Sequence, residues 1–164
     1  ELSDTTVTHN ADKVVLVSSV LNCFNCSFSQ QELNSTAFAS LSNNSIANFT
    51  SSLFEHGKAK LNGGGVSLTD STARFTRCTV NDVKAEGTGG FLSMQGDSGV
   101  SIAKSTFDKI ECSEKGALIF ANSGTITIEE TTVKNFKGTA IFLETAFKLE
   151  VTSSHFYDGE GAEG

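Results

Sequence analysis

One pattern of apolar and small residues recurs at nearly equal intervals along this chain. Its clearest copy, Gly124–Phe136, reads apolar-x-apolar-x-x-Thr-x-apolar-x-x-apolar. The apolar residue that follows the small one marks the successive repeats: Phe28, Phe54, Val80, Phe107, Val133 and Phe156. The steps between these residues are almost constant, and only the last is shorter. A nearly fixed period in the twenties is typical of solenoids, in which each repeat stacks on its neighbours.

A second apolar run, opened by glycine, follows most copies: Gly65–Leu68, Gly90–Met94, Gly116–Phe120 and Gly138–Leu143. Short strands also build sandwiches and barrels. Those folds would show variable spacing and frequent Asn-Gly or Asp-Gly hairpin turns, which are sparse here apart from Asp158-Gly159. The constant period therefore favours parallel coils stacked about 4.8 Å apart.

Stacked coils place equivalent residues in ladders. Besides the ladder that runs from Phe28 to Phe156, we expect a second apolar ladder: Cys23, Phe49, Phe75, Ile102, Ile128 and Val151. A third ladder holds small residues: Cys26, Ser52, Cys78, Ser105, Thr131 and Ser154. Such ladders together bury a core that no single repeat could bury alone.

Two N-terminal stretches fit the repeat less closely. Val14–Val17 is a continuous aliphatic run, as expected of a buried parallel strand. Residues 29–45 are rich in Ser, Asn and Gln, and we interpret them as an irregular, loop-rich insertion in which Ala37–Ala39 is the second strand element.

Two segments carry a resemblance to known proteins. Val80–Leu92 resembles the F-x-x-N … G-G-A-I repeats of polymorphic outer-membrane proteins, and Gly116–Ile119 is similar to their second half. The coils as a whole resemble right-handed parallel β-helices of the pectin-lyase-like class. The resemblance implies an all-β, right-handed parallel β-helix of about six to seven rungs. We expect residues 1–164 to form one such domain, a segment of a longer solenoid or a fibre subunit.

Composition limits the partners. The chain has 164 residues, of which 38% are hydrophobic and 19% charged, so it can bury a core. A net charge of −7 argues against nucleic acid or an anionic membrane surface as partner. No apolar run approaches the roughly 20 residues of a membrane helix. We expect no nucleic-acid partner and no membrane insertion in this segment.

Enzymes of the pectin-lyase-like class carry carboxylates on one outward face, often with calcium and a basic residue. One candidate column is Asp70, Asp97 and Asn122. A second is Asp82 and Asp108, near Arg77 and Lys104. Because Asp and Asn also cap turns, we favour the turn interpretation and assign no catalytic residue, metal ligand or cofactor. The three histidines, His9, His56 and His155, lie in different repeats.

The cysteines leave several alternatives open. Cys23-x-x-Cys26 is a spacing seen in zinc knuckles and redox pairs, but Cys78 and Cys112 do not form a second close pair. Small interior hydrophobes are the default interpretation. A local Cys23–Cys26 disulfide is the alternative that we retain.

Four Asn-x-Ser/Thr sequons occur, at Asn25, Asn34, Asn43 and Asn48. The ladder register turns Asn25 and Asn48 outward, and the other two lie in the irregular stretch. Their clustering predicts N-linked glycans and a eukaryotic secretory route.

These features favour a non-enzymatic structural or adhesive module, extracellular or at the cell surface. It would associate with itself through end rungs, or with neighbouring segments of the same chain, into a glycosylated filament. The alternative is a polysaccharide lyase, hydrolase or glycan-binding protein of the pectin-lyase-like class.

Overall fold

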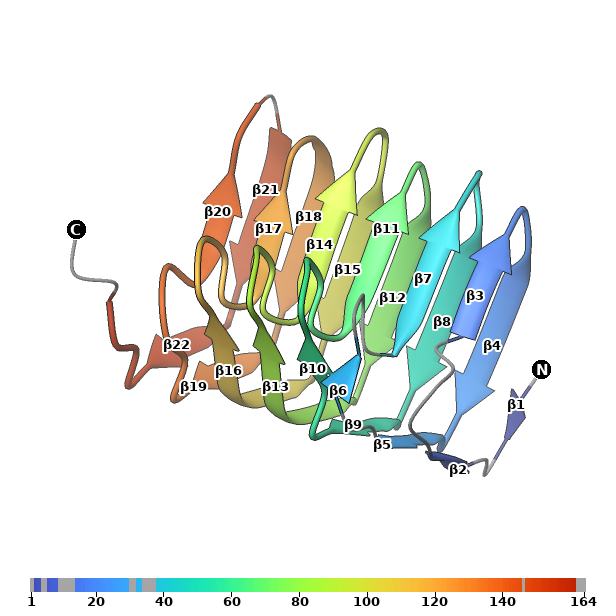
Figure 1. Cartoon of the computed structure of the whole chain (residues 1–164), viewed down its shortest axis with the longest axis horizontal. Helices are drawn as coiled ribbons and strands as arrows, with labels where there is room; N and C mark the ends of the chain where they lie inside the picture. Colours follow the sequence, from blue (N-terminus) through green and yellow to red (C-terminus); the bar gives the residue numbers. More distant parts are fainter. Residues whose placement is uncertain are drawn as a thin grey trace.

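The computed structural model describes residues 2–3, 6–8, 14–29, 32–33, 38–145 and 147–161. These residues form a coil of short strands, with no helix among them. Each turn passes through three strand positions, so equivalent strands stack into three parallel sheets, called sheets A, B and C here (Figure 1). The prediction of an all-β, parallel β-helix in which each sequence repeat makes one turn is confirmed.

The sheets contain the following strands. Sheet A comprises β1 (Leu2–Ser3), β4 (Val20–Phe24), β8 (Ile46–Thr50), β12 (Thr72–Thr76), β15 (Gly99–Ala103), β18 (Gly124–Glu129) and β21 (Phe147–Thr152). Sheet B comprises β2 (Thr6–Thr8), β5 (Ser27–Ser29), β9 (Leu53–Glu55), β13 (Thr79–Ala85), β16 (Thr106–Cys112), β19 (Thr132–Lys134) and β22 (His155–Tyr157), with β6 (Glu32–Leu33) and β10 (Lys58–Ala59) beside this path. Sheet C comprises β3 (Val14–Val17), β7 (Ala39–Ser42), β11 (Val66–Thr69), β14 (Leu92–Gln95), β17 (Ile119–Ala121) and β20 (Ile141–Leu143).

The strand register reproduces the sequence ladders. In sheet B, Val80 lies between Phe54 and Phe107. In sheet A, Phe75 lies between Phe49 and Ile102. One turn of the coil is therefore one repeat of the sequence, and the side chains of both apolar ladders point inward.

Stacked aromatic rings fill the N-terminal part of the core. Phe28 and Phe54 stack with ring centroids 4.8 Å apart, and Phe49 stacks on Phe75 at 5.1 Å. Phe91, from the corner before β14, packs edge-on against Phe75. Burying each such ring contributes about 2–3 kcal/mol of transfer free energy, and the ring pairs add roughly 0.5–1.5 kcal/mol.

Left-handed backbone makes the corner between sheets A and B, called the A–B corner here. One residue per turn has a positive φ there: Asn25, Ser51, Arg77, Lys104, Glu130 and Ser153. A further series lies within sheet B: His56, Asp82, Lys109, Asn135 and Asp158. None of these is glycine, although the left-handed region disfavours other residues by roughly 1–2 kcal/mol. Bonds to the next turn hold them, as when the Arg77 N–H donates to the Ala103 carbonyl.

Hydroxyl groups of the small-residue ladder fix the stacking at four of the six A–B corners that the structure describes, and Cys26 and Cys78 occupy the other two ladder positions. The Ser105 hydroxyl donates to the Ala103 carbonyl in its own turn and accepts from the Cys78 N–H in the preceding one, at 2.8 and 3.0 Å. Thr131 repeats this with Glu129 and the Ser105 N–H. The predicted ladder of small residues thus satisfies backbone groups that would otherwise be buried without partners. Equivalent serines line the corner between sheets C and A: Ser45, Ser71 and Ser98.

The two irregular N-terminal stretches also join the coil. Val14–Val17 forms β3 as expected, but the prediction of a fully buried strand is wrong, because Val15 and Val17 point outward from sheet C and are exposed. Within residues 29–45, β6 pairs with β10, and β7 pairs with β3 and β11. Ala39 belongs to β7, whereas Ala37 lies outside the described residues.

Candidate functional site

In the first candidate column, the Asp70 side chain bonds the backbone of the next turn. Asp70 occupies a left-handed position between β11 and β12, and its carboxylate accepts the Asp97 N–H at 2.9 Å. Asn122, one turn further, donates from its side-chain amide to Glu144 at 3.4 Å. The structure brings Asp70 and Asp97 to the same corner, and there the Asp70 carboxylate ties one turn to the next.

The second candidate column is out of register. Asn81, and not Asp82, lies opposite Asp108, and Asp82 occupies the left-handed position that Lys109 takes one turn later. The Asp82 carboxylate lies 3.1 Å from His56 Nδ1 and 3.9 Å from Lys84 Nζ.

The basic residues expected beside this column lie elsewhere. Arg77 and Lys104 occupy the A–B corner, where Arg77 Nε contacts the Ser51 hydroxyl and Lys104 pairs with Glu130. The contacts given for Asp82 and Asp108 come instead from other residues: His56, Lys84, Lys134 and Asn135.

Asp108 is held in its ionised form. Its carboxylate accepts from the Asn135 amide at 2.7 Å and pairs with Lys134 at 3.3 Å. The Asn135 hydrogen bond, with Lys134 in support, lowers the pKa of Asp108 below its ordinary value, although partial burial opposes the shift. Its partners lie on the next turn, so this carboxylate also links neighbouring turns.

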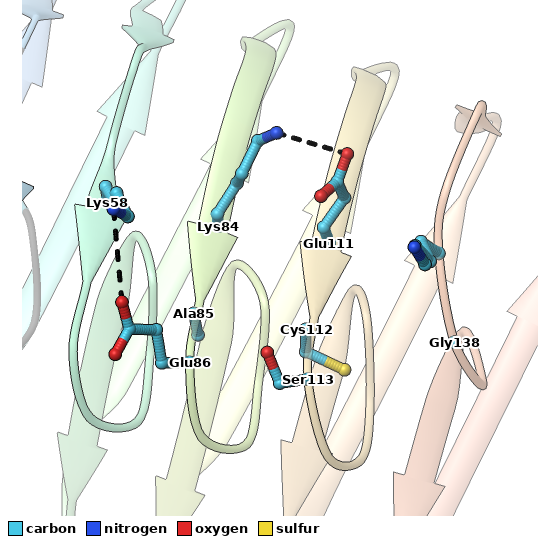
Figure 2. Close-up of a pocket in the computed structure, with 9 residues that line it drawn as sticks. Lys58, Lys84, Ala85, Glu86, Glu111, Cys112, Ser113 and Gly138 are labelled. Atoms are coloured by element: carbon cyan, nitrogen blue, oxygen red, sulfur yellow. Dashed lines mark ion pairs between the residues drawn. The ribbon is translucent and has the colours of Figure 1, made fainter. Parts of the chain in front are cut away.

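A pocket of about 450 Å³ lies on the outer side of sheet B, at the corner leading to sheet C (Figure 2). Charged side chains line much of it. Lys84 pairs with Glu111 at 3.2 Å, and Lys58 pairs with Glu86 at 3.9 Å, as the dashed lines in Figure 2 show. Lys137 also lines the pocket. Its backbone forms a parallel β-bridge with Glu111 on the previous turn, so it follows Glu111 in the same ladder.

The pocket lies where the coil becomes shorter. Ile119 follows Glu111 by eight residues along the chain. Their partners one turn later are Lys137 and Ile141, which are only four residues apart. The projecting corner of the earlier turns is therefore missing beside Gly138. This shortening accounts for the shorter final step between Val133 and Phe156 in the sequence, a signal that would have indicated an irregular surface here.

Buried thiols represent the only strong nucleophile type near the described candidates, and they are poorly suited to attack. Cys112 lines the pocket, and burial raises the pKa of its thiol. Burial likewise raises the pKa of Cys78 to about 11. Because the thiolate is the reactive form, both groups remain protonated at neutral pH. The pocket can hold a charged ligand, but its thiol is not poised for nucleophilic chemistry.

Cys23 and Cys26 are buried neighbours whose thiols are reduced in the structure. Burial, with a hydrogen bond to Cys26, raises the pKa of Cys23. Both belong to inward ladders, in agreement with the interior-hydrophobe interpretation. The Cys23–Cys26 disulfide stays a prediction.

The sequons lie at different kinds of position. Asn25 and Asn43 are exposed at left-handed corner positions. Asn48 is half-exposed on the outward face of β8, where its amide donates to Asn22 at 2.8 Å. Asn34 lies outside the described residues. The occupancy of all four sites stays a prediction.

A family model described as right handed beta helix region matches residues 15–163. The chain belongs to this right-handed β-helix family. No curated protein and no solved structure matches it. The right-handed coil implied by the resemblance is thus confirmed, while the finer resemblance to outer-membrane repeats stays a prediction.

Two further properties of this β-helix bear on its site. No helix in the part of the chain that the structure describes could span a membrane. Among the same residues, no three His, Cys, Asp or Glu side chains gather closely enough to hold a metal ion. His56 contacts Asp82, His155 is exposed on β22, and His9 lies outside the described residues.

Proposed function

We propose that this β-helix is a non-enzymatic structural or adhesive module, extracellular or at the cell surface, that assembles head to tail into a glycosylated filament. The observation that carries the proposal is the use of the outward charged groups. Asp70, Asp82 and Asp108 each contact a residue one turn away. Groups that a catalytic face would direct at a substrate here hold neighbouring turns together.

The last described turn offers a surface for association. Its strands β20, β21 and β22 each lie at the end of a sheet. Among the described residues, each of them pairs with a strand along one edge only. Leu149 and Val151, which continue the inward ladders of Ile126 and Ile128, are 42% and 41% exposed. Another rung, from a second copy or from further chain, would cover these side chains and extend all three sheets.

Sedimentation velocity and electron microscopy test this assembly. We expect wild-type protein to associate as its concentration rises and to form long fibres. Val151→Lys should abolish association by placing a charge at the stacking surface. Leu61→Lys is the matched control, because Leu61 is 61% exposed and lies in an inner turn of the coil, away from both ends. Discrete monomers at all concentrations, or equal effects of the two variants, would contradict head-to-tail assembly.

The pocket supports the alternative of a polysaccharide lyase, hydrolase or glycan-binding protein. It combines ammonium and carboxylate groups in one surface depression, next to Ser113. A panel of neutral and acidic polysaccharides, incubated with and without calcium, would reveal cleavage. Cleavage lost in Lys84→Ala/Glu111→Ala but kept in Lys104→Ala, whose side chain lies at the A–B corner, would favour this alternative.

A further inference from the structure

Two exposed apolar side chains lie on the strand next to Asn48 on the outer face of sheet A, while Arg74 lies opposite Asn48 on its other side. Strands β4 and β8 pair so that Val20 lies opposite Ile46, Asn22 opposite Asn48, and Phe24 opposite Thr50. Val20 is 63% exposed and Phe24 is 53% exposed. Both alternate with the buried residues of β4, so they point away from the core. The Asn22–Asn48 amide pair therefore lies between two exposed apolar groups.

The acceptor and its recognition residue lie on this same face. Thr50, which supplies the sequon hydroxyl, follows Asn48 by two residues and so points outward beside it. Adjacent strands lie about 4.8 Å apart, and alternate residues along a strand about 6.6 Å apart. Phe24 is thus within reach of the first sugar on Asn48.

We propose that Asn48 carries an N-linked glycan whose first sugar packs over Phe24. The apolar face of a pyranose ring covers aromatic and aliphatic surface favourably, because its C–H groups are removed from water together with that surface. Without a cover, the Phe24 ring is 53% exposed to water. The proposal rests on the proposed function, in which the module is glycosylated, and assigns one glycan to Asn48 and to the surface that it covers.

The modification is an ordinary transfer from a polyprenol-pyrophosphate-linked oligosaccharide. A bond forms between Asn48 Nδ2 and C1 of the first sugar, the bond from C1 to the pyrophosphate oxygen breaks, and Nδ2 loses one proton. The conjugated nitrogen retains one hydrogen with which it can donate. Because Asn48 lies in the middle of a paired strand, transfer precedes folding of this turn.

A thermodynamic cycle tests the contact between sugar and ring. The full chain is expressed in a eukaryotic secretory host as wild type, Asn48→Gln, Phe24→Ser and the double variant. We expect peptide mass spectrometry to find Asn48 occupied. Losing the glycan through Asn48→Gln should lower the melting temperature by about 3 °C in the wild-type background and by much less with Phe24→Ser.

Two controls separate this contact from other effects. Val17→Ser removes a side chain of nearly the same exposure on sheet C, and Asn48→Gln should keep its full effect in that background. The same variants made in bacteria, without glycan, measure the amide change alone. Nuclear Overhauser contacts between N-acetylglucosamine protons and the Phe24 ring give a direct readout.

The proposal is overturned if Asn48 is unmodified, or if removing its glycan has the same effect with Ser or Phe at position 24. Its failure is distinguishable from failure of the proposed function. Assembly is read from Val151 at the last described turn, and fibres can form whether or not Asn48 is modified.

Discussion

The A–B corner and the corner between sheets B and C, called the B–C corner here, both turn the chain from one sheet into the next. They differ in how much their length varies between turns. At the A–B corner, one left-handed residue recurs in each turn from Asn25 to Ser153, a buried hydroxyl bonds the backbone in half of these turns, and the spacing hardly varies. At the B–C corner, the chain projects from the coil and loses four residues between Glu111–Ile119 and Lys137–Ile141. Corner length is fixed where buried backbone groups depend on it, and variable where solvent can satisfy them.

An insertion tests this difference with the largest expected effect. One alanine between Lys104 and Ser105 would turn the side chains of β16 to the opposite face and expel Phe107. We expect a loss of more than about 4 kcal/mol in the free energy of unfolding. One glycine between Ser113 and Glu114, at the B–C corner, should cost less than about 1 kcal/mol. Urea unfolding followed by circular dichroism measures both losses of stability. Comparable losses would show that the two corners do not differ in their tolerance of an insertion.

Removing a single hydroxyl should have an intermediate effect. Ser105→Ala leaves the buried Cys78 N–H without its acceptor, so we expect a loss of about 1–3 kcal/mol. Ser105→Thr should restore most of the stability, since Thr131 occupies the same ladder one turn later. The exposed Ser113→Ala should change stability by less than about 0.5 kcal/mol. A neutral Ser105→Ala variant would show that the hydroxyl ladder is dispensable.

Acidification should affect a smaller set of contacts in sheet B. The pKa of Asp108 is lower in the folded protein than in the unfolded chain, so its contribution is present above the unfolded pKa and declines as the pH falls through the folded one. NMR titration should place the Asp108 carboxyl below its ordinary range, and Asn135→Ala should raise it. Asp108→Asn should reduce the acid sensitivity of the melting temperature. An Asp108 pKa that does not respond to Asn135→Ala would remove this link between turns.

Thiol labelling compares the two corners with the least disturbance. Cys78 belongs to the A–B corner ladder, while Cys112 borders the pocket at the B–C corner. Both thiols should react slowly with iodoacetamide at neutral pH, because burial raises both pKa values. Cys112 should react several-fold faster than Cys78 in the folded protein, and the two rates should converge in urea. Faster labelling of Cys78 would mean that the A–B corner opens more readily.

Sequence periodicity was sufficient to predict the interior of the coil. Phe54, Val80 and Phe107 fall in one ladder because inward positions must repeat with every turn. The outward candidates were harder to place. Asp82 follows its ladder residue Val80 by two positions, whereas Asp108 follows Phe107 by one, so the two carboxylates are one residue out of register. Counting from the ladder residues would have revealed this offset.

The pocket was less accessible to sequence reasoning. Its lysines and glutamates come from several turns, and their pairing depends on the backbone path at the B–C corner. The shorter final step of the repeat indicates a deletion but not which corner is shortened. The left-handed corners were also missed, because Asn, Ser, Arg and Lys occupy positions where glycine was the expected residue.

The stacking has a consequence for how such a chain acquires its structure. Each strand finds its partner one repeat away along the chain, whatever the total number of turns. Each new turn therefore costs about the same loop-closure entropy. No contact requires residues from distant parts of the chain to meet. Growth from any formed pair of turns resembles crystallisation in one dimension, with the newest rung serving as the template for the next.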